Sequence, residues 1–279
     1  MAVEVDLHLH TLASDGRLTP TELVRLVASQ GLKYVAITDH DTTEGLAEAY
    51  EAAKDFPDLK IIPGIELSAD IPGDEVHVLG YFLDYADSDF QEQLQQFRAG
   101  RVDRAKLMVE KLDSLGVHLE WDRVQAMAGD GAVGRPHIAL AMVEAGYCKE
   151  PKEAFPEYLA RNGLAYVERS KLTPESAVEI IRNVGGVAVL AHPAYMNDME
   201  SGIANLSRCG LTGMEVHYSQ YDDDTIRQLA RLAREYRLIP CGGSDYHGLG
   251  NTGEPLPGSN GPSMESVELL AAAALTVAE

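Results

Sequence analysis

Seven short runs with the composition of β-strands recur along this chain, and helical segments fill most of the gaps between them. The first run is the clearest, because residues 3–10 place apolar side chains at odd positions and polar ones at even positions, which is the period of a strand. The other runs cover residues 34–38, 60–67, 75–82, 187–191, 213–217 and 238–242. This alternation of strands and helices predicts an α/β fold.

Two helix starts carry explicit signals. Thr19-Pro20-Thr21-Glu22 combines an N-cap, a first-turn proline and a capping-box glutamate, and Thr173-Pro174 opens a second helix in the same way. The strands are unevenly spaced, with four before residue 83 and three after residue 186. We therefore expect residues 1–85 and 185–279 to form a barrel, and residues 86–184 to form a helical insertion that caps it, since this segment is too long for a loop.

Composition restricts the class of protein. The 279 residues include 44 acids and 23 bases, a net charge of -21, which argues against a surface that grips long nucleic acid by its phosphates. No stretch approaches the roughly 20 apolar residues of a membrane helix, and the N-terminus lacks the pattern of a secretory signal. The three cysteines are far apart and form no CxxC pair. A reduced, cytoplasmic protein without membrane partners is the expectation.

Each strand ends in, or is soon followed by, side chains that bind metal ions. In chain order they are His8 and His10; Asp39, His40 and Asp41; Glu66; His77; His192; Glu215 and His217; and Asp245 and His247. Functional groups of α/β barrels gather at the carboxyl ends of the strands. We therefore expect these side chains to converge on one point.

The spacing of His8 and His10 has a physical reason. Residues two apart on a strand point to the same face, roughly 7 Å apart, so both imidazoles can reach one ion. Alone this pair is a weak signal, but seven of the nine histidines fall at or just beyond strand ends. Glu66 lies in an apolar strand, where a carboxylate is costly unless paired or metal-bound, so it is a candidate bridge between two ions. A set of histidines and carboxylates without cysteine suits zinc, manganese or iron.

Taken in order, these residues resemble the polymerase and histidinol phosphatase (PHP) family. The matching motifs are Asp6-Leu7-His8-Leu9-His10 with Ser14-Asp15-Gly16, Thr38-Asp39-His40-Asp41, Gly64-Ile65-Glu66, His77, Ala191-His192-Pro193 and Gly243-Ser244-Asp245-Tyr246-His247. The chain is most similar to the small bacterial phosphoesterases of the nucleoside 3',5'-bisphosphate phosphatase or RNase AM type. Their similarity extends into the insertion, around residues 101–105 and 134–137.

The resemblance implies a distorted (β/α)7 barrel with two or three divalent ions of manganese, zinc or iron. Position by position, it implies one ion on His8, His10, Glu66 and Asp245, a second on Glu66, His77 and His192, and a third on Asp15, His40 and His247. Without this resemblance, Asp15 reads as an ordinary turn aspartate before glycine. The implied reaction is attack by a metal-bridging hydroxide on a phosphate ester, with no protein nucleophile.

Substrate contacts are expected from a second set of residues. Arg135 can pair bidentately with a phosphate, Arg101 can bind a second anionic group, and His137 is a further phosphate contact. The position of His217 at the end of a predicted strand places it near the site, where it either contacts the substrate or holds a metal ligand in place. We expect Arg104 to be a solvated helix residue. Relatives of this type often have glycine and arginine after His-Pro, whereas this chain has Ala194-Tyr195, so a basic contact is missing or supplied elsewhere.

These patterns predict a phosphomonoesterase that acts on a small nucleotide, such as the 3'-phosphate of a nucleoside 3',5'-bisphosphate. Trimming of short RNA from its 5' end by the same hydrolysis is a close alternative. An amidohydrolase-like C–N hydrolase also uses the His8-Leu9-His10 pattern, but no lysine stands at a central strand end. A non-catalytic metal-binding module is the third alternative. The sequence leaves the oligomeric state open.

Overall fold

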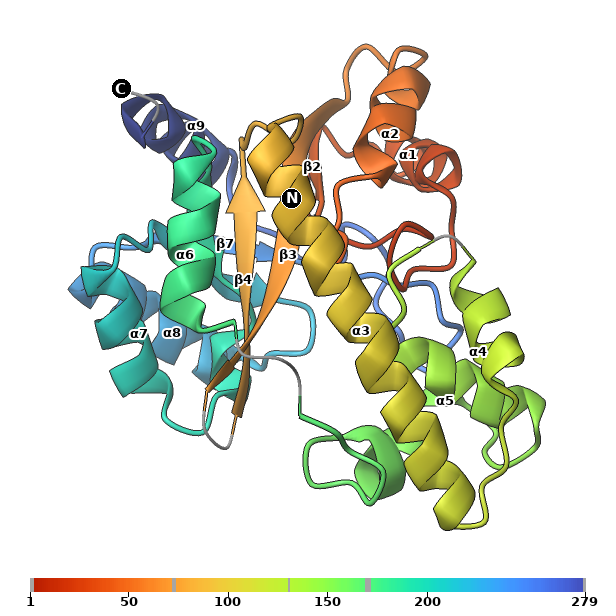
Figure 1. Cartoon of the computed structure of the whole chain (residues 1–279). Coiled ribbons are helices and arrows are strands. Elements are labelled where there is room, and N and C mark those ends of the chain that lie inside the picture. Colours follow the sequence, from red (N-terminus) through yellow and green to blue (C-terminus); the bar gives the residue numbers. More distant parts are fainter. Residues whose placement is uncertain (1–2, 72–73, 130, 169–171, 278–279) are drawn as a thin grey trace.

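A computed structural model describes residues 3–71, 74–129, 131–168 and 172–277 (Figure 1). The strands are β1 (Val5–Leu9), β2 (Tyr34–Ile37), β3 (Lys60–Ile71), β4 (Asp74–Tyr81), β5 (Val187–Leu190), β6 (Gly213–Tyr218) and β7 (Ile239–Gly243). The α-helices are α1 (Pro20–Ser29), α2 (Gly45–Ala53), α3 (Ser88–Ser114), α4 (Trp121–Ala128), α5 (Arg135–Glu144), α6 (Pro174–Asn183), α7 (Met199–Arg208), α8 (Asp223–Glu235) and α9 (Met264–Val277). All seven predicted strands are present among the described residues.

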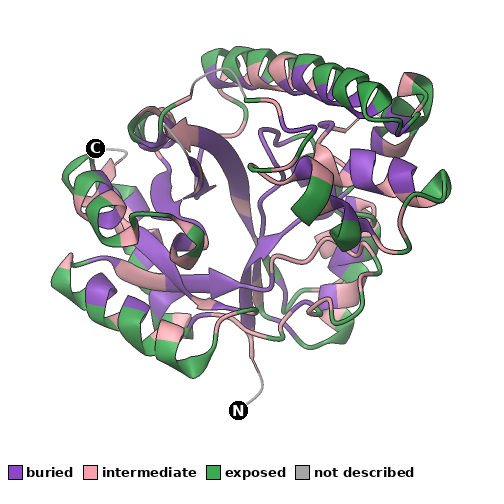
Figure 2. Cartoon of the chain, turned by 90° about the horizontal axis from the view of Figure 1, so that it is seen from below, coloured by how far each residue is buried: buried purple, intermediate pink, exposed green. Residues whose placement is uncertain are grey.

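The strands form one sheet in the order β1 to β7. β4 runs antiparallel to both β3 and β5, and the other hydrogen-bonded neighbours are parallel. Beyond β7, the Asp245 N–H donates to the His8 carbonyl (2.9 Å), and the His10 N–H donates to the Tyr246 carbonyl (3.0 Å). These bonds bring the last strand against the first, so the sheet is a nearly closed barrel with helices around it (Figure 2). The predicted distorted (β/α)7 barrel is confirmed, and β4 is where it departs from an all-parallel one.

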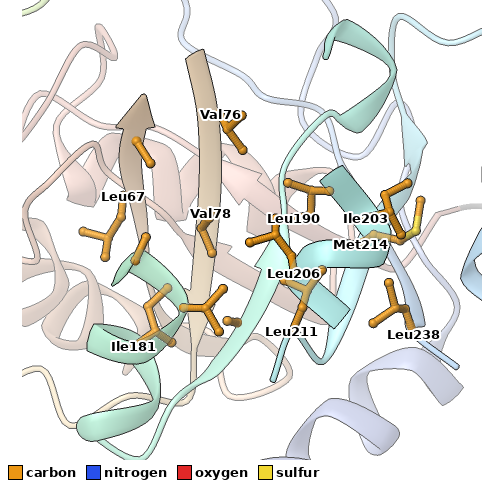
Figure 3. Packing of buried hydrophobic residues seen from close by; sticks show 14 of the residues in the cluster. Leu67, Val76, Val78, Ile181, Leu190, Ile203, Leu206, Leu211, Met214 and Leu238 are labelled. Atoms are coloured by element: carbon orange, nitrogen blue, oxygen red, sulfur yellow. The ribbon is translucent and has the colours of Figure 1, made fainter. Parts of the chain in front are cut away.

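The barrel is held by apolar packing between its outer face and the helices. Figure 3 shows Leu67, Val78 and Leu190 of the sheet in the same buried cluster as Ile181 of α6 and Leu206 of α7. On β1 the apolar side chains belong to such clusters, whereas the alternate polar side chains point into the barrel. The interior of the barrel is therefore polar where the predicted ligands lie.

The predicted helix starts are also confirmed. The Thr19 side chain accepts from the Glu22 N–H (3.1 Å) and the Glu22 carboxylate accepts from the Thr19 N–H (2.9 Å). Thr173 caps α6 by accepting from the Ser176 N–H (3.2 Å). These capping bonds satisfy backbone donors that the first turn of a helix leaves free.

Among the described residues between β4 and β5, α3, α4, α5 and two short helical turns extend away from the barrel, whereas α6 packs against the sheet (Figure 1). The long helix α3 runs alongside α5, and their apolar side chains form a buried cluster that draws its members from residues 105–165. A helical unit that caps the barrel needs a hydrophobic core of its own, and this cluster is such a core. The division at residues 86 and 184 stays a prediction.

None of the helices in the described part of the chain has both the length and the apolar character to cross a bilayer. Cys148, Cys209 and Cys241 are free thiols.

Gly243 provides a test of how β7 closes on β1. A Cβ atom there would lie 2.5 Å from the Cβ and backbone nitrogen of His8 and 2.7 Å from Asp6 Oδ1. We expect Gly243→Ala to lower the free energy of unfolding by about 1–3 kcal/mol, because the backbone must shift to make room. Chemical denaturation measures this change.

Gly100 in α3 is the matched control, because a Cβ atom there meets no described atom within 4 Å. Gly100→Ala should leave stability unchanged or raise it by about 0.5–1 kcal/mol. Equal stability of the Gly243→Ala variant and the parent chain would contradict the close approach of the two strands.

Candidate metal centre

His8 and His10 project from β1 to the same pair of carboxylates. His8 Nε2 lies 3.2 Å from Glu66 Oε2 and 3.2 Å from Asp245 Oδ1. His10 Nε2 lies 3.3 Å and 3.1 Å from the same two atoms. Ligand atoms about 2.0–2.2 Å from one ion, at tetrahedral or octahedral angles, are about 3.0–3.5 Å apart. The four atoms therefore have the spacing of a single first-row ion's coordination sphere.

The Glu66 carboxylate is the centre of the cluster. Its Oε2 faces His8, His10 and His40, with His40 Nδ1 at 3.2 Å, and its Oε1 lies 2.7 Å from His77 Nδ1 and 3.2 Å from His192 Nε2. Burial by itself raises the pKa of this carboxyl, but the surrounding histidines hold it well below its usual range. Glu66 is therefore ionised, and its two oxygens face different sets of imidazoles, which is the geometry of a bridging ligand.

A third group forms around Asp15. Asp15 Oδ1 lies 3.4 Å from His247 Nε2 and 3.7 Å from His10 Nδ1, and Asp15 Oδ2 lies 3.7 Å from His40 Nε2. The loop is held by the Ser14 and Gly16 N–H groups, which both donate to the Thr11 carbonyl. The structure thus brings all nine predicted ligands together at one end of the barrel.

These residues fit divalent ions. Three sets of ligand atoms, each within 4.8 Å of one another, comprise His8, His10, Glu66 and Asp245; His10, Asp15, His40 and His247; and His40, Glu66 and His77. The buried His10 Nδ1 has no hydrogen-bond partner among the described residues. Buried polar atoms without a partner are costly, which indicates that a group other than the protein's own side chains completes this site.

Glu215 contacts two of the predicted ligands, and it was among the strand-end side chains expected to converge although no site role was assigned to it. Its Oε1 lies 3.1 Å from His8 Nδ1, and its Oε2 accepts from the backbone N–H of His192 (2.8 Å). A proton on His8 Nδ1 leaves Nε2 free to coordinate a metal, which is the usual role of such a carboxylate. The sequence signal was the acid within an apolar strand, but its direction could not be read.

A register shift in β6 between Glu215 and His217 explains why the direction of the Glu215 side chain could not be read from the sequence. With strict alternation, Glu215 and His217 would share a face. Instead Glu215 and Tyr218 both face the cluster, since the Tyr218 hydroxyl donates to Asp245 Oδ2 (2.7 Å). His217 is half-buried, and within the described part of the chain no hydrogen bond or ion pair joins it to the ligands. The structure therefore does not bring His217 to the metal centre.

Local backbone strain is concentrated at the same place. Of the five non-glycine residues with positive φ among those described, three are Asp41 (54°), His192 (28°) and Asp245 (54°). Two of these are predicted ligands, and Asp41 follows a third, His40. Such conformations cost of order 1–3 kcal/mol each and persist where the surroundings hold them, often at functional sites.

Three of the four predicted substrate contacts, Arg101, Arg135 and His137, lie where the helices between β4 and β5 meet this site. Arg101 Nε donates to Asp41 Oδ2 (2.5 Å), and its Nη2 donates to Ser68 Oγ (2.7 Å). Arg135 Nη2 lies 2.8 Å from Glu75 Oε2. Both guanidinium groups therefore face the site while they are paired with acids of the barrel.

His137 and Gly134 connect the start of α5 to the ligands. A Cβ atom on Gly134 would lie 3.4 Å from Arg101 Nη1 and 3.5 Å from Asp15 Oδ2. The Gly134 N–H donates to His137 Nδ1 (2.9 Å), so a neutral His137 carries its proton on Nε2. Burial lowers the pKa of His137 to about 4, which keeps the ring neutral near pH 7.

Arg104 was expected on a solvated face, and this was wrong. It is buried, its Nε donates to the Val167 carbonyl (2.7 Å), and its guanidinium lies over the Tyr166 ring at 5.1 Å. His118 is exposed and pairs with Asp113, away from the metal centre.

Comparisons with known proteins find similarity over most of the chain. The family model described as PHP domain matches residues 6–172. The Escherichia coli 5'-3' exoribonuclease Rnm is 37% identical over 251 residues, covering 88% of this chain and 86% of that protein. A 3',5'-nucleoside bisphosphate phosphatase from Chromobacterium violaceum is 32% identical and covers 89% of each chain. The crystal structure of a candidate metal-dependent phosphoesterase from Bifidobacterium adolescentis superposes with a TM-score of 0.85 at 30% identity, covering 96% of this chain and 95% of that one.

Removal of Glu215 tests the support of the ligands. Glu215→Ala leaves the His8 Nδ1–H and the His192 N–H without their acceptor, so we expect Mn²⁺ affinity to fall about 10–100-fold. Titration calorimetry measures the affinity, and circular dichroism confirms that the variant folds. Glu235→Ala on the exposed end of α8 is the control and should bind as the parent does. Unchanged affinity in folded Glu215→Ala would contradict this role.

Metal binding should also release protons. Burial lowers the pKa of His77 and His247, but nearby carboxylates outweigh it and raise these pKa values to about 9 and about 10. Both rings therefore hold a proton near pH 7 that a metal ion must displace, and affinity should rise as pH increases toward 9. Calorimetry in buffers of different ionisation enthalpy measures the release. Heats that do not depend on the buffer would refute the prediction.

Proposed function

We propose, from the premise that the chain belongs to the PHP domain family and is a metal-dependent phosphoesterase, that it hydrolyses phosphate monoesters of small nucleotides. Its substrate in this proposal is a nucleoside 3',5'-bisphosphate, from which it removes the 3'-phosphate. The observation that carries the proposal is the cluster of ionised carboxylates and histidines beside two arginines. The name of the phosphatase at 32% identity supports the same substrate class.

In this proposal the ligands divide as the resemblance to the PHP family implies. His8, His10, Glu66 and Asp245 hold one ion; Glu66, His77 and His192 hold a second; and Asp15, His40 and His247 hold a third. Manganese, zinc and iron all suit this mixture of nitrogen and oxygen donors. Such ions supply an activated water and positive charge that holds the phosphoryl oxygens.

The chain's own residues would then orient the ester. Arg101 and Arg135 face the ligands from the helical side, and each can exchange part of its bond to Asp41 or Glu75 for a bond to a phosphate oxygen. The neutral His137 offers its Nε2–H to the same group. His217 has no part in this arrangement.

The helices of residues 86–184 act as the cap in this proposal. They carry Arg101, Arg135 and His137, whereas the barrel of residues 1–85 and 185–279 carries all nine ligands. Substrate recognition and metal binding would thus come from different units. We also propose a cytoplasmic setting, because Cys148, Cys209 and Cys241 are free thiols and reduced cysteines are usual there.

A second candidate reaction is 5'-to-3' trimming of short RNA by the same site. The exoribonuclease at 37% identity favours it. The net charge of -21 favours the smaller substrate, because a strongly acidic surface repels a long phosphate backbone.

Two substrates and one variant test the proposal. With Mn²⁺ present, we expect the protein to release inorganic phosphate from adenosine 3',5'-bisphosphate. Release of mononucleotides from a 5'-phosphorylated RNA of a few residues would instead identify the exoribonuclease. His8→Ala should lower either activity more than about 100-fold, because loss of even an outer partner of a metal ligand costs about 10–100-fold.

His118→Ala is the matched control, since His118 is exposed and its side chain bonds only to Asp113 among the described contacts. It should keep full activity. Full activity in folded His8→Ala would refute the site, and turnover of neither ester by the metal-loaded protein would refute the function.

A further inference from the structure

Three tyrosines form an aromatic wall on one side of the metal centre. Tyr195 follows His192 in a short helical turn, Tyr218 ends β6, and Tyr221 lies just beyond it. The Tyr195 ring is 6.0 Å from the His192 ring, 5.9 Å from Tyr218 and 5.8 Å from Tyr221, measured between centroids. Tyr218 in turn donates to the ligand Asp245. The wall is therefore continuous with the predicted ligands.

The members of this wall differ in exposure. Tyr218 is 3% exposed, whereas Tyr195 is 56% exposed, one of the most exposed large apolar side chains among the described residues. The other two members have clear tasks, since the Tyr221 hydroxyl accepts from the Ala194 N–H (3.0 Å) and Tyr218 restrains Asp245. More than half of Tyr195 faces solvent at the rim of the site without such a task.

Tyr195 is nevertheless held in place. It packs nearly edge-to-face against Tyr218 (83°), and its hydroxyl donates to Gln220 Oε1 (3.3 Å). The backbone beneath it is fixed by the N–H bond from Ala194. A ring already fixed by folding loses little conformational freedom when a flat ligand stacks on it, which favours binding.

We infer that Tyr195 is a stacking platform for the nucleobase of the substrate. This inference rests on the proposed function, in which the phosphate of a nucleotide lies on the metal centre. In a nucleotide placed there, one sugar separates the base from the phosphate. The exposed Tyr195 ring, which contacts the ring of His192, lies about that far from the metal centre. Aromatic rings accept every base by its π-face, so Tyr195 favours nucleotides over other phosphate esters without selecting one base.

The test separates the base from the rest of the substrate. We compare kcat/KM for adenosine 3',5'-bisphosphate with kcat/KM for the abasic analogue, the 3',5'-bisphosphate of the tetrahydrofuran sugar. Tyr195→Ala should lower kcat/KM for the nucleotide about 5- to 100-fold and leave the abasic value unchanged, because only the first substrate can stack. Tyr195→Phe should keep the parent values, since the ring remains.

Tyr147→Ala is the matched control, an exposed tyrosine (44%) just beyond the opposite end of α5 from Arg135, and it should change neither value. An equal loss on both substrates in Tyr195→Ala, or no loss on either, would overturn the stacking platform while the parent enzyme stays active. If the parent releases phosphate from neither substrate, the proposed function is wrong, and the inference about Tyr195 is wrong with it.

Discussion

The buried charge of Glu66 is the constraint on which the rest of the site depends. A carboxylate that is 1% exposed inside a barrel is unstable unless cations surround it, and five histidines face its two oxygens. Those histidines are far apart in sequence, so only closure of the sheet brings them to one point. Closure of the barrel and stabilisation of the Glu66 charge therefore depend on each other. The close approach of Gly243 to His8 is part of both, because it joins β7 to the strand that carries His8.

The antiparallel strand β4 also helps to surround the Glu66 carboxylate with histidines. In an all-parallel barrel a long crossover would separate β3 from β4, whereas here β4 returns directly beside β3. This pairing aligns His77 with Ser68, two residues beyond Glu66, and lets its imidazole reach Glu66 Oε1. The antiparallel direction of β4 thus places His77, a candidate ligand, beside Glu66, where a parallel strand would not place it.

Sequence reasoning recovered the strands, and it anticipated which side chains gather at one end of the barrel, because their signals are local. Alternation on β1 fixes which side chains share a face, and a histidine at a strand end has few structural uses. It failed where the outcome depends on tertiary detail. The register shift in β6 moves Tyr218 inward in place of His217, and no local pattern marks it. Arg104 has the composition of a surface residue, but the packing of Tyr166 against α3 buries it. Asp15 was assigned only by resemblance, because a turn aspartate before glycine has no distinctive signal.

The acidic residues around the arginines explain how an acidic protein can hold the two arginines of the proposed phosphate site. Asp41 and Glu75 neutralise Arg101 and Arg135 within the protein, so neither guanidinium is a buried unpaired charge. In the proposed complex, each arginine can turn some of its five donors to a phosphate oxygen while the others keep their bonds to the acids. The acids thus hold the arginines oriented toward the candidate ligands. In a chain with a net charge of -21, the two arginines supply positive charge where a phosphate group would bind in the proposed function.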